Sequence, residues 1–276
     1  PADPAADPAR PAVSTSAVLP GEDLGTVTGS QTLARGLTHH QLQLGTTAAP
    51  AAWTVQLVLP STTEGVKDAP VGSEAVAQAT VDRLRVLAGE RVLVVTGAAH
   101  ADAVREQVPD LPSDLLIAEP SPRDSMAAIG LAAAVLELRD PEAIIGSFAA
   151  DHVIGDQAAF DRAVTEAVGV AQRDDRLVTI GIEPTFPSTG FGYIQMGPRL
   201  RAHPSAARVR QFVEKPDARR AASYLATGEF RWNAGMFVVR ATTLLDLLGR
   251  WHPELADGLR EIAADPTLLA ERWEGL

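Results

Sequence analysis

The sequence predicts an α/β protein in which helices flank a mixed, mostly parallel central sheet. From residue 73 onward, apolar segments of strand length alternate with longer segments that have helical spacing. The apolar segments are nearly continuous, as in RVLVVTG at 91–97, which is typical of strands buried on both faces. Beyond residue 190 the pattern becomes rich in strands, and helices follow to the end of the sequence.

Each element of this prediction follows from its local sequence. Ser73 is a suitable cap for a helix that runs to about Leu87. The later predicted strands lie at 91–97, 114–120, 143–151, 177–182, 192–197, 209–216 and 232–240. Predicted helices follow the first three of these strands, and they end near 108, 138 and 172. Strands that alternate with helices in this way predict a doubly covered sheet.

The first 72 residues have a different character, because they are rich in alanine, threonine, proline, glycine and serine. Residues 1–12, PADPAADPARPA, are expected to be extended and disordered. The one convincing strand is AAWTVQLVLP at 51–60, in which apolar side chains such as Trp53 and Val55 alternate with polar ones. We therefore divide the chain into an atypical segment, 1–72, and a core, 73–276.

The composition excludes several classes of function. A net charge of −11 argues against a nucleic-acid backbone as the partner. The absence of cysteine excludes disulfides, thiolate catalysis and cysteine-bound zinc. No apolar run reaches membrane-spanning length, and the start lacks the features of a signal peptide. The expectation is a soluble cytoplasmic protein that binds neither nucleic acid nor membranes.

Charged and polar side chains follow several predicted strands, at the edge where sheets of this kind bind ligands. Asp151 follows the strand at 143–151 and is either a turn aspartate or a ligand of Mg²⁺, which prefers oxygen donors. Glu119, Arg123 and Asp124 come between a strand and a helix whose free N–H groups attract anions. Capping and packing alone would account for the start of that helix.

The strand-rich part contains three more candidates. Lys215 is one of only two lysines among 24 basic residues, and its compact charge suits either a phosphate or a solvated turn. Glu214, its neighbour, could orient a sugar hydroxyl or face water. Asn233 has Gly235 two positions after it, a pairing that often marks only a turn. Because it lies inside an apolar strand, its amide needs a buried partner or a ligand.

The segment TGFGYIQMG, at 189–197, places two glycines beside aromatic rings. Glycine inside a strand weakens it, and it usually marks a bulge or a close approach of the backbone to another group. Gly190 and Gly192 are therefore candidates for positions where the backbone approaches a ligand.

Five motifs together resemble the mannose-1-phosphate guanylyltransferases. They are EPSPRDSMAAIGLAA, FAADHVI, LVTIGIEPTFPSTGFGYIQMG, FVEKPD and WNAGMFV, in this order over some 200 residues. The resemblance implies a Rossmann-like nucleotidyltransferase fold and transfer of a nucleotidyl group from GTP to mannose-1-phosphate, with Mg²⁺ as cofactor. GTP and mannose-1-phosphate are the expected partners, and a homodimer is a further option.

The resemblance also implies roles for individual residues. Asp151 would bind the metal, and Lys215 would bind the sugar phosphate, both as catalytic residues. Sugar-binding and nucleotide-binding roles would fall to Gly190, Gly192, Tyr193, Glu214, Asn233 and Gly235 on the sugar side, and to Glu119, Arg123 and Asp124 on the nucleotide side.

The N-terminal part of the sequence departs from the family pattern. The family's glycine-rich loop, GGxGxRLxPLS, is not found, and PSTTEG at 60–65 has neither the paired glycines nor the arginine. Relatives are also expected to continue beyond a segment like the one that ends at Leu276. An active guanylyltransferase, a catalytically impaired relative that binds sugar phosphates or nucleotide sugars, and a nucleotidyltransferase for another hexose-1-phosphate all remain open.

Overall fold

The computed structural model describes residues 13–18, 39–44, 53–56, 59–60, 73–89, 91–121, 123, 125–149, 152, 154 and 156–276. The lead at 1–12 that the sequence predicts to be disordered lies outside these residues. So do the candidate ligands Asp124 and Asp151.

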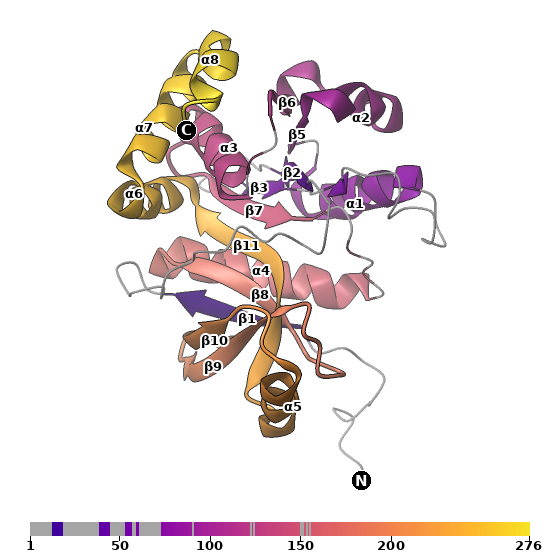
Figure 1. The fold of residues 1–276 in the computed structure, drawn as a ribbon, viewed down its shortest axis with the longest axis vertical. Coiled ribbons are helices and arrows are strands. Elements are labelled where there is room, and N and C mark those ends of the chain that lie inside the picture. The colour runs from indigo at the N-terminus through magenta and orange to yellow at the C-terminus, as the bar shows by residue number, and fades with distance from the viewer. Residues whose placement is uncertain are drawn as a thin grey trace.

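The described strands form one sheet of eleven strands (Figure 1). Their order is β6-β5-β2-β7-β11-β8-β1-β10-β9, with β3 beside β7 and β4 beside β2. The strands are β1 (Val13–Val18), β2 (His39–Leu44), β3 (Trp53–Gln56), β4 (Leu59–Pro60), β5 (Val92–Gly97), β6 (Leu116–Glu119), β7 (Ile144–Phe148), β8 (Leu177–Ile182), β9 (Gly192–Leu200), β10 (His203–Val213) and β11 (Phe230–Arg240).

The strand directions confirm a mixed sheet. The pairings make β3 to β9 run one way and β1, β2, β10 and β11 the other, so seven of the eleven strands share a direction. Most hydrogen-bonded neighbours are nevertheless antiparallel, because β2 stands between β5 and β7, and β11 between β7 and β8.

Several predicted boundaries need correction. The strand expected at 114–120 begins only at Leu116, because residues 113–115 form a short 3₁₀ turn. The strand expected at 143–151 ends at Phe148, and the one expected from residue 209 begins at His203. The first 72 residues contribute β1 and β2 to the sheet in addition to the strand expected at 51–60, of which β3 and β4 are described.

Helices cover both faces of the sheet, as the near-continuous apolar strands predict. One apolar cluster joins β5, β7, β8 and β11 to α1, α2 and α4, and a second joins β7 and β11 to α3, α6, α7 and α8. In the described part of the chain, no helix combines the length and the apolar character needed to cross a membrane. The helices are α1 (Ser73–Ala88), α2 (Ala101–Gln107), α3 (Ser125–Arg139), α4 (Gln157–Asp174), α5 (Ala218–Thr227), α6 (Ala241–Trp251), α7 (Pro253–Ala264) and α8 (Leu269–Trp273).

The small residues of α3 allow close packing on both of its sides. Ala128 and Ala132 lie against Leu93 and Val95 of β5. On the side toward α7, a Cβ atom at Gly130 would come within 2.6 Å of a Leu259 methyl group. This helix is therefore held between the sheet and the C-terminal helices.

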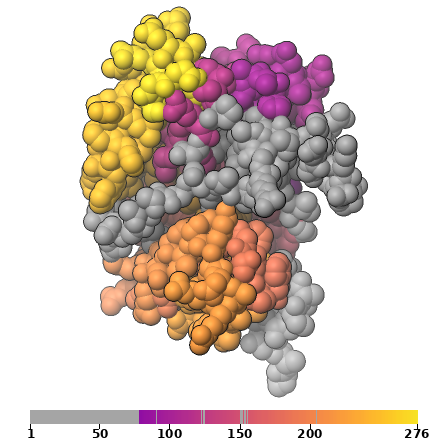
Figure 2. All heavy atoms as spheres, viewed as in Figure 1, coloured from indigo at the N-terminus to yellow at the C-terminus, as the bar shows by residue number. Residues whose placement is uncertain are grey.

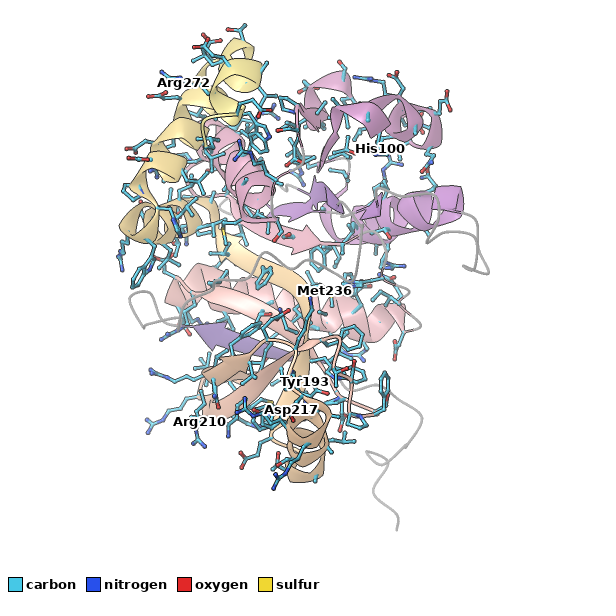
Figure 3. The ribbon with its side chains drawn as sticks, viewed as in Figure 1. His100, Tyr193, Arg210, Asp217, Met236 and Arg272 are labelled. Atoms are coloured by element: carbon cyan, nitrogen blue, oxygen red, sulfur yellow. The ribbon has the colours of Figure 1, made fainter. Side chains whose placement is uncertain are left out.

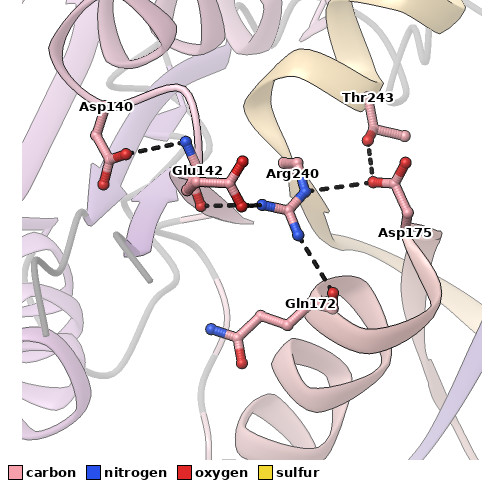
Figure 4. A network of polar contacts seen from close by, with 6 residues as sticks. All are labelled: Asp140, Glu142, Gln172, Asp175, Arg240 and Thr243. Carbon is pink, nitrogen blue, oxygen red and sulfur yellow. Dashed lines mark hydrogen bonds and ion pairs between the residues drawn. The ribbon is translucent and has the colours of Figure 1, made fainter. Parts of the chain in front are cut away.

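A polar network around Arg240 fixes the end of β11 (Figure 4). The Arg240 guanidinium pairs with Glu142 and lies 3.4 Å from the Asp175 carboxylate, and it donates to the Gln172 carbonyl at 3.2 Å. The Thr243 hydroxyl donates to the same Asp175 carboxylate. These contacts connect β11 to the end of α4 and to the turn before β7, and so they hold the strand whose opposite half carries Asn233.

Candidate functional site

Three residues singled out in the sequence come together on one face of the sheet formed by β9, β10 and β11. Asn233 lies directly opposite Gly192 in the β9–β11 pairing. A Cβ atom at Gly192 would lie 2.7 Å from the Glu214 carboxylate and 3.4 Å from the Asn233 Cβ atom. We call this group, together with Lys215, the ribbon site.

Gly192 makes room for protein side chains, which differs from the expectation that its missing side chain admits a sugar ring. The space beside its Cα atom holds the Glu214 carboxylate and the Phe212 ring, whose Cζ atom is 3.0 Å from the position of a Cβ. Gly190 is different, because it is exposed and, of the residues that the structure describes, a Cβ there would meet only the Ser188 hydroxyl, at 3.7 Å. Of these two glycines, only Gly190 leaves open space.

Asn233 is buried, with 6% of its surface exposed. Its Oδ1 atom accepts hydrogen bonds from the Thr179 hydroxyl at 3.1 Å and from the Gly235 N–H at 3.3 Å. Its amide nitrogen has no partner in the described part of the chain. The oxygen therefore orients the side chain, and the amide N–H groups are available as donors.

Gly235 has a structural reason to be glycine. Its φ of 68° lies in the left-handed region, and the pairing of β11 with β8 shifts register between Asn233 and Met236. A residue with a side chain is strained in this conformation. The resulting bulge turns the Gly235 N–H back toward Asn233, so Gly235 positions the asparagine.

Lys215 and Glu214 form an ion pair at the end of β10. The Lys215 ammonium lies 3.7 Å from the Glu214 carboxylate, and each side chain is 32% exposed. The backbone of Lys215 has a φ of 41°, which is uncommon for a residue with a side chain and concentrates at functional sites. The next residues start α5, whose first turn is capped when Asp217 accepts from the Arg220 N–H at 2.9 Å.

Tyr193 lies on the opposite face from the ribbon site, and its side chain has no exposed surface. Its ring packs near Tyr224, at 5.5 Å between centroids, in a cluster with Phe230 and α5. Its hydroxyl donates to the Ser188 carbonyl at 2.9 Å. Figure 3 shows Tyr193 and Asp217 in the same end of the molecule, beside α5. The geometry gives Tyr193 a role in holding the turn before Gly190, since it cannot touch a ligand in this arrangement.

Arg231 lies in β11, opposite Ile194 of β9. Burial lowers the pKa of its guanidinium, Glu183 partly opposes this shift, and Arg199 adds to it. Its Nη1 atom donates to the carbonyls of Gly228 and Phe230, both at 2.9 Å. Arg231 is thus bound to its own turn.

Two of the residues expected on the nucleotide side, Glu119 and Arg123, do not join the ribbon site. Glu119 ends β6 and is buried, and β6 and β9 are the two ends of the strand order. The Arg123 guanidinium donates to the carbonyls of Trp273, at 2.8 Å, and Leu276. The indole N–H of Trp273 in turn donates to the Ser121 carbonyl at 2.9 Å. Arg123 therefore anchors the C-terminal helix, and its role toward a nucleotide stays a prediction.

The strands that carry the ribbon site are separated from the C-terminal helices that Arg123 contacts. Figure 2 shows the orange residues of these strands at one end of the molecule and the yellow C-terminal helices at the other. Among the described residues, no three histidine, aspartate or glutamate side chains gather as a metal site would require. Asp151 lies outside them, and Mg²⁺ binding stays a prediction.

Phe212 is a residue of the ribbon site that the sequence prediction missed. It precedes Glu214 by two positions, near the end of β10, and the residue is 40% exposed. Side chains two positions apart in a strand share a face, so the alternation in RQFVE is the signal that could have found it.

Comparisons with known proteins agree with this fold. The nucleotidyl transferase family matches residues 60–273. The xanthan biosynthesis protein XanB of Xanthomonas campestris pv. campestris (strain B100) is 40% identical over 208 residues, which are 74% of this chain and 41% of XanB. The mannose-1-phosphate guanylyltransferase of Escherichia coli (strain K12) is 38% identical over 205 residues, 71% of this chain and 43% of that enzyme. The chain thus spans about two fifths of the length of these curated relatives.

Two solved structures have a similar fold. One, described as a mannose-1-phosphate geranyltransferase from Thermus thermophilus, has a TM-score of 0.64 and 31% identity over 73% of this chain and 57% of that one. The other, a mannose-6-phosphate isomerase from Helicobacter pylori, has a TM-score of 0.58 and 28% identity over 68% of this chain and 70% of that one. The chain therefore belongs to the nucleotidyl transferase family, among the relatives of the mannose-1-phosphate guanylyltransferases.

Proposed function

We propose that the protein takes part in nucleotidyl transfer from GTP to mannose-1-phosphate, which gives GDP-mannose and pyrophosphate. The observation that carries this proposal is the convergence of Gly192, Glu214, Lys215 and Asn233 at the ribbon site. This site brings together a carboxylate, an ammonium group and an amide donor. A phosphorylated sugar requires the same three kinds of group.

Each group has a distinct task in this proposal. The Glu214 carboxylate accepts hydrogen bonds from sugar hydroxyls, and the Asn233 amide donates to a hydroxyl oxygen. The Lys215 ammonium binds the sugar phosphate as a compact charge. The 3.7 Å separation between Lys215 and Glu214 keeps the ammonium at the site before a phosphate arrives.

In the reaction, an oxygen of the sugar phosphate attacks the α-phosphorus of GTP. A new bond forms between that oxygen and phosphorus, and the bond from the α-phosphorus to the bridging oxygen breaks, so that pyrophosphate leaves with the electron pair. Mg²⁺, when bound, neutralises phosphate charge, and Asp151 is the residue of this chain that would hold it. No covalent intermediate with the protein is required.

The test is pyrophosphate release by the full-length protein with Mg²⁺, over a matrix of nucleoside triphosphates and hexose-1-phosphates. We expect the highest rate with GTP and mannose-1-phosphate. A higher rate with glucose-1-phosphate or another nucleotide would replace the substrates and keep the reaction. Arg219→Ala, an exposed change on α5, is the control for Lys215→Ala, which we expect to lower the rate.

A second candidate is a relative that binds nucleotide sugars without turning over GTP. Two observations favour it: the glycine-rich loop is absent from the sequence, and Arg123 is occupied by backbone carbonyls. Loss of a single positioned donor typically lowers a rate by about 10²–10³-fold. Binding of GDP-mannose without pyrophosphate release would select this candidate.

A further inference from the structure

Phe212 is an exposed aromatic side chain in the middle of the ribbon site. It lies opposite Ile194 in the β9–β10 pairing, on the face that carries Gly192 and Glu214. The residue is 40% exposed, and no other aromatic ring lies against its ring in the described part of the chain. The ring reaches this place because position 192 has no side chain.

The two other exposed phenylalanines of this region have a different environment. Phe186 and Phe191 pack against Trp232, with centroid distances of 5.0 and 5.1 Å. Trp232 lies opposite Tyr193, on the face away from the ribbon site. These rings stabilise one another, whereas Phe212 presents its apolar surface next to the Glu214 carboxylate. Ligand sites commonly combine apolar rings with a few converging polar groups.

We infer that Phe212 is a sugar-positioning residue, whose ring lies against the C–H face of the hexose that Glu214 and Asn233 hold by its hydroxyls. This inference rests on the proposed function. The hydroxyls of a pyranose point mainly outward from its rim, which leaves C–H groups on its faces. These weakly positive hydrogens are attracted to the electron-rich face of an aromatic ring, and their contact also removes apolar surface from water.

The test compares the binding of three ligands, mannose-1-phosphate, GDP-mannose and GDP, by calorimetry on the full-length protein. In Phe212→Ala we expect about tenfold weaker binding of the two sugar ligands, the size of an aromatic contact, and unchanged binding of GDP. Phe212→Leu keeps apolar bulk without the ring, so it protects the fold and should still lose most of this affinity. Phe186→Ala, at a ring that is 53% exposed on the other face, is the matched control and should change none of the three.

The outcomes separate the inference from the proposed function. If the wild-type protein binds mannose-1-phosphate and both Phe212 variants bind it equally well, the inference is wrong and the proposed function stands. An equal loss for GDP and the sugar ligands would also overturn it, because the ring would then act on the nucleotide or on the fold. If the wild-type protein binds neither sugar ligand, the proposed function fails, and the inference fails with it.

Discussion

The ribbon site and the region at the end of β6 each contain a glutamate and a basic residue, but the fold uses them differently. In the ribbon, Glu214 and Lys215 are each 32% exposed and lie beside an amide donor. Glu119, the last residue of β6, is 3% exposed, and the guanidinium of Arg123, just after this strand, is bound to carbonyls at the end of the C-terminal helix. Residue type alone therefore does not separate a group that is available to a ligand from one that the fold already uses.

The difference arises from the elements that carry the residues. Glu214, Gly192 and Asn233 lie on or directly beside paired strands, where the register aligns their side chains on one face. Arg123 lies in a connection between a strand and a helix, where backbone carbonyls at the end of the C-terminal helix are within reach. A guanidinium with five donors satisfies two such carbonyls at once.

The largest expected effect is a loss of stability when the contacts of Arg123, in the segment after β6, are removed. Arg123→Ala removes two charge-assisted hydrogen bonds from a partly buried site. We expect a loss of about 2–4 kcal/mol in the free energy of unfolding. Thermal and urea denaturation measure this loss, and calorimetry should show unchanged affinity for mannose-1-phosphate.

Arg105→Ala is the control for Arg123→Ala. Arg105 is exposed and, among the described residues, pairs only with Asp102, at 2.7 Å one turn away, so its loss should change the stability by less than about 0.5 kcal/mol. If Arg123→Ala weakens nucleotide binding while the protein stays as stable as the wild type, Arg123 faces a ligand after all.

The next largest effect is expected on ligand binding at the ribbon site. Lys215→Ala removes the charge assigned to the sugar phosphate, and we expect mannose-1-phosphate to bind about 10- to 100-fold more weakly, which corresponds to one lost charged hydrogen bond. GDP should bind as before, and the Tm should change little because the side chain is partly exposed. An equal loss for both ligands would show that the charge is not specific for the sugar phosphate.

The smallest expected effect comes from a comparison of the two glycines, Gly192 and Gly190. In Gly192→Ala the new methyl group would lie 2.7 Å from the Glu214 carboxylate, which is the flexible end of its side chain and can move. We expect a small change in stability and about tenfold weaker binding of mannose-1-phosphate, because one hydrogen-bonding group is displaced. Gly190→Ala, where a Cβ meets nothing closer than 3.7 Å, is the control for protein contacts. If Gly192→Ala binds mannose-1-phosphate as tightly as the wild type, sugar binding does not depend on the close approach of the Glu214 carboxylate to position 192.

The sequence by itself determined the fold class and the positions of most elements. The run at 91–97 predicts β5, and the small-residue segment at 123–138 predicts α3, because hydrophobic periodicity is a local property. The motifs at 189–197, 212–217 and 232–238 also predicted that Gly192, Glu214 and Asn233 belong to one family pattern. It did not reveal β1 and β2, whose segments contain several polar residues and no long apolar run.

Only the tertiary structure decided which groups touch. Gly192 accommodates Glu214 and Phe212 because β9 and β10 pair in one register, and a shift by one residue would send these side chains to the other face. Arg123 is occupied because a segment about 150 residues further along the chain folds back against it. Such contacts depend on how distant segments pack, and no local pattern of residues specifies that packing.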